Sequence, residues 1–167
     1  PKAGSFFSVA REWKSGDVVQ LTLPMKIRPE TRYNDSVAIL RGPLYFSLKI
    51  GEHFKKLKSY HDTLPVADWA VYPATPWNYG LVLDRENPED GVQVINRPVS
   101  PVPFSNEDAP VVLKIKGRLL PEWTLVDNSA DAPPQSPVVS DQPLANLELI
   151  PYGSTRLRIT EFPVLGK

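Results

Sequence analysis

The chain has 167 residues, of which 41% are hydrophobic and 23% are charged, with 19 Lys and Arg balanced by 19 Asp and Glu. This length and composition predict one folded domain or two small ones, and they exclude a disordered chain. Zero net charge argues against nucleic acid or a membrane surface as partner, and the absence of Cys excludes disulfides and thiolate metal sites.

Strand signals dominate the first third of the chain. Apolar or alternating runs bounded by turn residues predict strands at 6–13, 18–23, 37–40 and 44–50. In the second of these runs, Val19, Leu21 and Leu23 would share one face, and we expect that face and Trp13 to pack between sheets. Ser15-Gly16-Asp17 predicts the hairpin turn that precedes it.

The rest of the chain is less regular. Residues 54–60 favour a strand or a short helical turn, and further strands are expected at 68–73, 77–83, 92–95, 111–115, 119–126, 147–150 and 155–162. Four Pro make residues 98–110 a loop or an edge strand. The Pro-rich residues 127–143 predict an irregular loop, either ordered or mobile.

These elements predict an all-β fold, an antiparallel β-sandwich. The alternative is one partial sandwich plus a second small β-domain. In either case we expect residues 1–52 to complete a first sandwich. Residues 53–167 would then form a C-terminal sandwich-like region that contains the 127–143 loop.

The charges are unevenly distributed along the chain. Residues 1–60 hold 11 basic and 5 acidic residues, a net of +6, whereas residues 61–110 hold 2 basic and 8 acidic, a net of −6. Either these loops differ in composition only, or the basic part packs against the acidic part, or each part faces another surface of a larger protein. The last two alternatives would suit a protein–protein interaction module.

The sequence offers no catalytic constellation. His53 and His61 are eight residues apart and match no metal-binding spacing. The acidic pairs Asp84/Glu86 and Glu89/Asp90 fall in polar turns, where solvated carboxylates are the ordinary outcome. We therefore predict no catalytic residue, no metal and no cofactor in this chain.

Aromatic residues provide the candidate binding site. Exposed rings beside polar side chains can stack on a sugar while the polar groups bind its hydroxyls. The densest group, and the candidate carbohydrate-binding set, is Trp69, Tyr72, Trp77, Asn78 and Tyr79. The alternative is that these rings are buried in the core or pack a domain interface, as most Trp residues do.

Several motifs resemble one family. Residues 11–25 resemble an R-x-W-x-x-G-D-x-V-x-L-x-L-P-M strand pair, and residues 37–44 resemble a V-A-I-x-R-G-P-L segment. Residues 146–163 are similar to the closing strands of the same family, and Trp77-Asn78-Tyr79 also occurs in its C-terminal region. The family is the beta-L-arabinofuranosidase-like glycoside hydrolases, glycoside hydrolase family 127.

The resemblance implies an accessory role. Members carry an (α/α)6 barrel with the catalytic Cys and Glu and a zinc-binding Cys cluster, followed by β-sandwich domains. None of those residues can be placed on this chain, so the resemblance implies a non-catalytic C-terminal β-domain that supports the barrel, the cleft rim or an oligomer interface. Its partners would be the N-terminal barrel of the same protein, a carbohydrate or a second copy of the chain. The implied location is periplasmic or extracytoplasmic, and Pro1 predicts an excised segment of a longer protein.

Overall fold

The computed structural model describes residues 4–64 and 66–166. Pro1, on which the expectation of an excised segment rests, lies outside them. The described residues form a nearly all-β fold with antiparallel sheets, which confirms the predicted fold class. Short 3-10 turns η1 (Tyr33–Asp35), η2 (Pro88–Gly91) and η3 (Tyr152–Ser154) connect some of the strands. The strands are β1 (Ile27–Thr31), β2 (Val37–Arg41), β3 (Leu44–Leu48), β4 (Glu52–Ser59), β5 (Ala67–Pro73), β6 (Tyr79–Leu81), β7 (Gln93–Asn96), β8 (Val111–Leu119), β9 (Leu125–Val126), β10 (Ser129–Ala130) and β11 (Leu144–Pro151).

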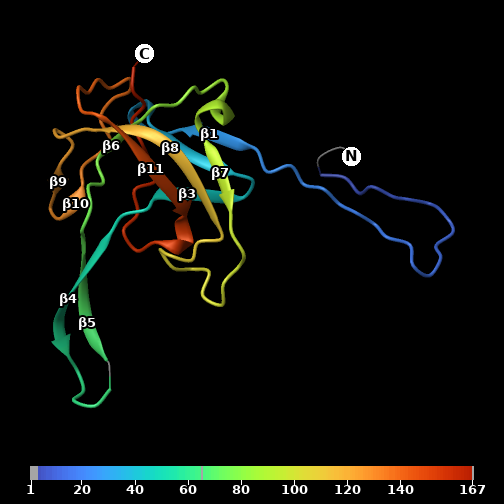
Figure 1. The fold of residues 1–167 in the computed structure, drawn as a ribbon, viewed down its shortest axis with the longest axis horizontal. Coiled ribbons are helices and arrows are strands. Elements are labelled where there is room, and N and C mark those ends of the chain that lie inside the picture. Colours follow the sequence, from blue (N-terminus) through green and yellow to red (C-terminus); the bar gives the residue numbers. More distant parts are fainter. Residues whose placement is uncertain (1–3, 65, 167) are drawn as a thin grey trace.

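One seven-stranded sheet forms the body of the molecule (Figure 1). Its order is β1–β2–β3–β11–β8–β6, and β7 also pairs with β8. The sheet curls into a half-barrel, so that one face of each strand points inward. It contains strands from both sides of residue 52, and the division into 1–52 and 53–167 stays a prediction.

The C-terminal segment joins separate strands of this curled sheet. Phe162 exchanges two backbone hydrogen bonds with Val37 of β2, at 2.8 and 2.9 Å. Leu81 of β6 donates its amide to Pro163 O at 2.8 Å, and Leu165 N donates to Leu81 O at 2.9 Å. The regular strand that we predicted at 155–162 is therefore not formed. The segment pairs briefly with several strands instead of running along one neighbouring strand.

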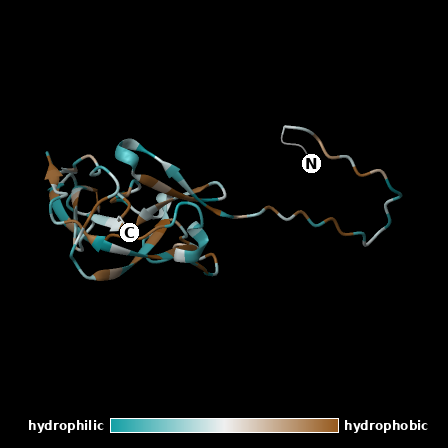
Figure 2. Ribbon diagram, turned by 90° about the horizontal axis from the view of Figure 1, so that it is seen from above, coloured by the Kyte–Doolittle hydropathy of each residue, from teal (hydrophilic) through white to brown (hydrophobic). Residues whose placement is uncertain are grey.

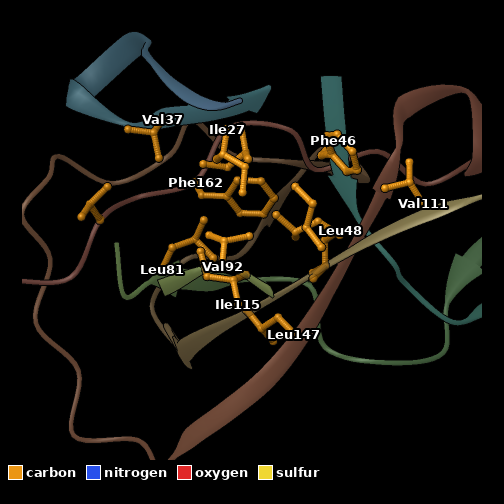
Figure 3. Close-up of a cluster of buried hydrophobic side chains, with 14 of the residues drawn as sticks. Ile27, Val37, Phe46, Leu48, Leu81, Val92, Val111, Ile115, Leu147 and Phe162 are labelled. Atoms are coloured by element: carbon orange, nitrogen blue, oxygen red, sulfur yellow. The ribbon is translucent and has the colours of Figure 1, made fainter. Parts of the chain in front are cut away.

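The core fills the curled sheet (Figure 3). Aliphatic side chains from β1, β2, β3, β6, β8 and β11 enclose Phe46 and Phe162, which are both 0% exposed. All of Val37–Leu40 is buried, which explains why this strand reads as a continuous apolar run instead of an alternating one. Trp123 is only 3% exposed, in a turn after β8, where a strand over 119–126 was predicted.

The two strands predicted in the first 23 residues do not form. Residues 4–26, here called the arm, are largely extended, exposed and without β-pairing (Figures 1 and 2). The turn at Gly16 does form, with φ of +92° and a 3.1 Å bond from Asp17 N to Lys14 O. The expected packing of Trp13 and of the Leu21 face between sheets is wrong, because no second apolar layer lies against the arm.

A two-stranded ribbon, β4–β5, extends away from the body (Figure 1). For residues 54–60 we expected either a strand or a short helical turn, and the ribbon shows that the strand is correct. The second ribbon, β9–β10, turns at Asp127 and Asn128, whose positive φ values of 51° and 63° suit a tight hairpin turn. The rest of the 127–143 loop is ordered: Asn34 donates its side-chain amide to Pro133 O at 2.9 Å, and Val138 N donates to Val164 O at 2.9 Å.

Candidate functional site

An ion pair fixes the point where the β4–β5 ribbon leaves the body. The Arg156 guanidinium and backbone amide bind the two carboxylate oxygens of Glu52, at 3.0 and 3.1 Å. The Glu52 side chain is only 7% exposed, whereas that of Arg156 is 62% exposed. The guanidinium also lies 5.3 Å from the ring centre of Phe54. Arg156 borders three adjacent hollows of the surface.

One of these hollows is a cavity of about 580 Å³ between the ribbon base, the β9–β10 hairpin and residues 156–159. We call it the Arg158 cavity. Tyr72 and Trp77 contribute aromatic rings to its wall, and Asn128 and Ser129 contribute an amide and a hydroxyl. Arg156 and Arg158 provide its charged groups. The volume is within the range of small-molecule sites, and the lining combines apolar faces with a few polar groups.

The structure divides the five predicted carbohydrate-binding residues. Tyr72 is 46% exposed and shares the Arg158 cavity with Trp77, which is half-buried and packs edge-on against Trp123 at 5.1 Å. Trp69 is 49% exposed but lies further along the ribbon, beside Lys56, whose ammonium is 5.2 Å from the ring centre. Two of the five residues, Tyr72 and Trp77, are therefore brought to one cavity.

The other two residues have contacts of a structural kind. The Asn78 amide donates to Leu120 O at 2.8 Å and to Trp123 O at 3.0 Å, so it holds the turn after β8. Tyr79 packs against the main core and borders a different hollow. Neither residue lines the Arg158 cavity.

Sequence reasoning missed the polar half of this cavity. Arg156 and Arg158 fall in the strand predicted at 155–162 and Asn128 in the loop predicted at 127–143, and none of the three was a candidate binding residue. The sequence does not show that these residues share a cavity with the aromatic residues, because they are far apart in the chain. Only the fold brings residues near 72, 128 and 158 together. The Asp127-Asn128 pair, typical of a tight turn, was the available signal for a hairpin there.

The acidic residues of a neighbouring hollow do not resemble an acid–base pair. A hollow of about 640 Å³ next to the Arg158 cavity is lined by Glu52, Glu107 and Glu148. Glu52 is paired with Arg156, and Lys49 pairs with Glu107 at 3.0 Å and with Glu148 at 4.0 Å. Carboxylates that are each held by a cation are better suited to fixing structure than to exchanging protons with a substrate.

The histidines and acidic pairs that the sequence analysis set aside also lie apart in the structure. His53 is near the ribbon base, whereas His61 is at its tip and accepts from the amides of Thr63 and Leu64, both at 3.2 Å. Asp84 caps a turn by accepting from the amides of Glu86 and Asn87. Within residues 4–64 and 66–166, no group of three or more His, Asp and Glu side chains could hold a metal ion.

One tyrosine has a perturbed pKa. The Tyr60 hydroxyl donates to the Asp68 carboxylate at 2.6 Å across the ribbon. This hydrogen bond stabilises the protonated phenol beside a negative charge, and with a smaller effect of burial it raises the pKa of Tyr60 above its usual 10.0. The pair stiffens the outer ribbon and lies away from the Arg158 cavity.

No family model matches the chain, and neither curated proteins nor solved structures give a significant match. The resemblance to glycoside hydrolase family 127 therefore stays a prediction that rests on the motifs quoted above. Among the residues that the structure describes, no helix has the length and apolar character needed to cross a bilayer.

Proposed function

We propose that this chain is a non-catalytic β-domain of a glycoside hydrolase, and that it packs against another part of that enzyme through its arm. The supporting observation is the exposure of the arm's apolar residues. Val19, Leu21 and Leu23 are 73%, 80% and 70% exposed, and their alternation places them on one face. Phe6 and Phe7 are also exposed, at 102% and 73%.

Such a segment is costly to leave in water. Fully burying one Leu or Phe side chain contributes about 1.5–3 kcal/mol, and the arm has several of them. Soluble proteins seldom keep apolar surface of this extent unless another surface covers it. The pattern matches the role that the family resemblance implies, in which the first residues complete a sandwich next to the catalytic barrel.

The test uses the complete gene product and a matched pair of substitutions. Leu21→Asp introduces a charge on the arm's apolar face, whereas Val139→Asp introduces it at a residue that is 91% exposed on the body. We expect Leu21→Asp to lower the thermal stability of the whole protein and its hydrolysis of arabinofuranosides, and Val139→Asp to change neither. Equal behaviour of the two variants, or turnover of an arabinofuranoside by this chain alone, would overturn the proposal.

Carbohydrate binding is a second candidate function. It is favoured by one observation, the meeting of Tyr72 and Trp77 in the Arg158 cavity. Aromatic faces that stack on sugar rings, with an amide and a hydroxyl nearby, are the features that a saccharide requires. Isothermal titration of the chain with neutral and acidic oligosaccharides tests this candidate, which fails if neither kind binds.

A further inference from the structure

The charge of the Arg158 cavity points to the class of ligand. Among the described residues that line it, the only charged side chains are Arg156 and Arg158. No carboxylate lines the cavity, although acidic side chains line the neighbouring hollow. A concave site lined by one sign of charge concentrates ligands of the opposite sign.

The two arginines differ in how their charge is balanced. Arg156 is paired with the buried carboxylate of Glu52 at 3.0 Å, so most of its charge is compensated within the protein. Arg158 forms no ion pair in the described part of the chain. Among the charged side chains of the lining, Arg158 is therefore the one whose charge no described carboxylate balances.

Arg158 is also held in position. Its Nε donates to Tyr152 O at 3.2 Å, and its guanidinium lies 4.5 Å from the centre of the Tyr152 ring. These contacts use the inner nitrogen and one flat face of the guanidinium. The two terminal nitrogens, which bind a carboxylate in a bidentate pair, make no hydrogen bond within the described residues.

The rest of the lining suits a sugar ring. Tyr72 exposes nearly half of its surface, and Trp77 is fixed by its edge-on contact with Trp123. Asn128 and Ser129 are exposed at the β9–β10 turn and offer an amide and a hydroxyl to sugar hydroxyls. An aromatic ring held by its contact with Trp123, an arginine and small polar side chains in one lining are features of saccharide recognition.

We propose that the Arg158 cavity binds an acidic saccharide, one that carries a uronate residue. The uronate carboxylate binds the terminal nitrogens of Arg158, and the apolar face of a sugar ring stacks on Tyr72. The inference rests on the carbohydrate-binding candidate and adds to it the charge of the ligand. It is independent of the role proposed for the arm.

Isothermal titration of the full chain with trigalacturonate, and with a neutral galactose trisaccharide of equal length, tests the proposal. We expect trigalacturonate to bind more tightly, and Arg158→Gln to weaken its binding at least about tenfold while leaving the neutral trisaccharide unchanged. Arg158→Lys should lose part of the affinity, because a point charge replaces the bidentate fork. Tyr72→Ala should weaken both sugars, and Arg28→Gln, which removes an exposed charge elsewhere, should weaken neither.

Different failures have different meanings. If both trisaccharides bind equally well, or if Arg158→Gln leaves trigalacturonate binding unchanged, the inference about acidic sugars is wrong and the carbohydrate-binding candidate stands. If neither trisaccharide binds at millimolar concentration, both are wrong. If a triglutamate peptide binds as tightly as trigalacturonate, the ligand class is wrong. Circular dichroism of each variant excludes loss of fold as the cause of lost binding.

Discussion

Phe162 provides the most direct test of how the curled sheet is held together. Its side chain is 0% exposed in the main core, and its backbone exchanges two hydrogen bonds with Val37 (Figure 3). Phe162→Ala removes the ring and keeps the backbone pairing. Phe6→Ala makes the same chemical change on the arm, where the side chain is 102% exposed.

The expected magnitudes differ widely. Truncating a buried Phe to Ala costs about 3–5 kcal/mol, since the lost burial is added to the cost of the cavity that remains. For a chain of this size that loss lowers Tm by about 6–20 °C. Phe6→Ala should stay within about 0.5 kcal/mol of the unchanged protein.

Urea unfolding, followed by tryptophan fluorescence, measures both variants. Trp77 and Trp123 pack on each other in the body, so their emission reports loss of the fold. The reasoning is refuted if Phe162→Ala costs less than about 1 kcal/mol or if Phe6→Ala costs as much. The first outcome would mean that the C-terminal segment does not belong to the core. The second would mean that the arm is packed in solution.

Three further predictions concern the body and the ribbon. Arg156→Gln should lower the free energy of unfolding by about 1–3 kcal/mol in urea titrations, because it leaves a buried carboxylate without its cation. Asp68→Asn should lower the pKa of Tyr60 toward its usual value in an ultraviolet pH titration. Because the pKa of Tyr60 is raised in the folded state, its contribution to stability is present below pH of about 10 and is lost as the pH rises through the folded pKa. Gly117→Ala should cost about 1–3 kcal/mol in urea unfolding, since its Cβ would lie 2.7 Å from a backbone carbonyl of β6, whereas Gly91→Ala, with 3.7 Å of room, should cost little.

Local patterns predicted most strands of the body correctly. The apolar run at 37–40 became β2, most of the alternation at 44–50 became β3, and the apolar run at 111–115 became part of β8. These strands could be predicted from local sequence because their apolar side chains favour burial, whichever strands they pair with. The same type of pattern at 18–23 failed, because an apolar face becomes a strand only when a neighbouring strand and a covering layer are present.

The candidate site was only half predictable. Tyr72 and Trp77 could be chosen because aromatic residues beside turn residues are recognisable in one stretch of sequence. Arg156 and Arg158 could not, since an alternating Arg–Leu–Arg–Ile run has the same appearance whether its arginines face solvent or a cavity. Only the position of residues 156–159 against the ribbon base distinguishes the two.

By itself the sequence determined the class of this protein: all-β, antiparallel, without thiol chemistry and without a basic surplus. It could do so because period-two alternation, turn residues and composition act within a few neighbouring residues. Tertiary structure alone decided that the C-terminal segment closes the curled sheet and that the arm is uncovered. It also decided that Arg158, which has no ion pair among the described residues, lines a cavity together with two aromatic residues. Those features depend on contacts between residues as far apart as Val37 and Phe162, and no local pattern encodes which distant partner a strand will meet.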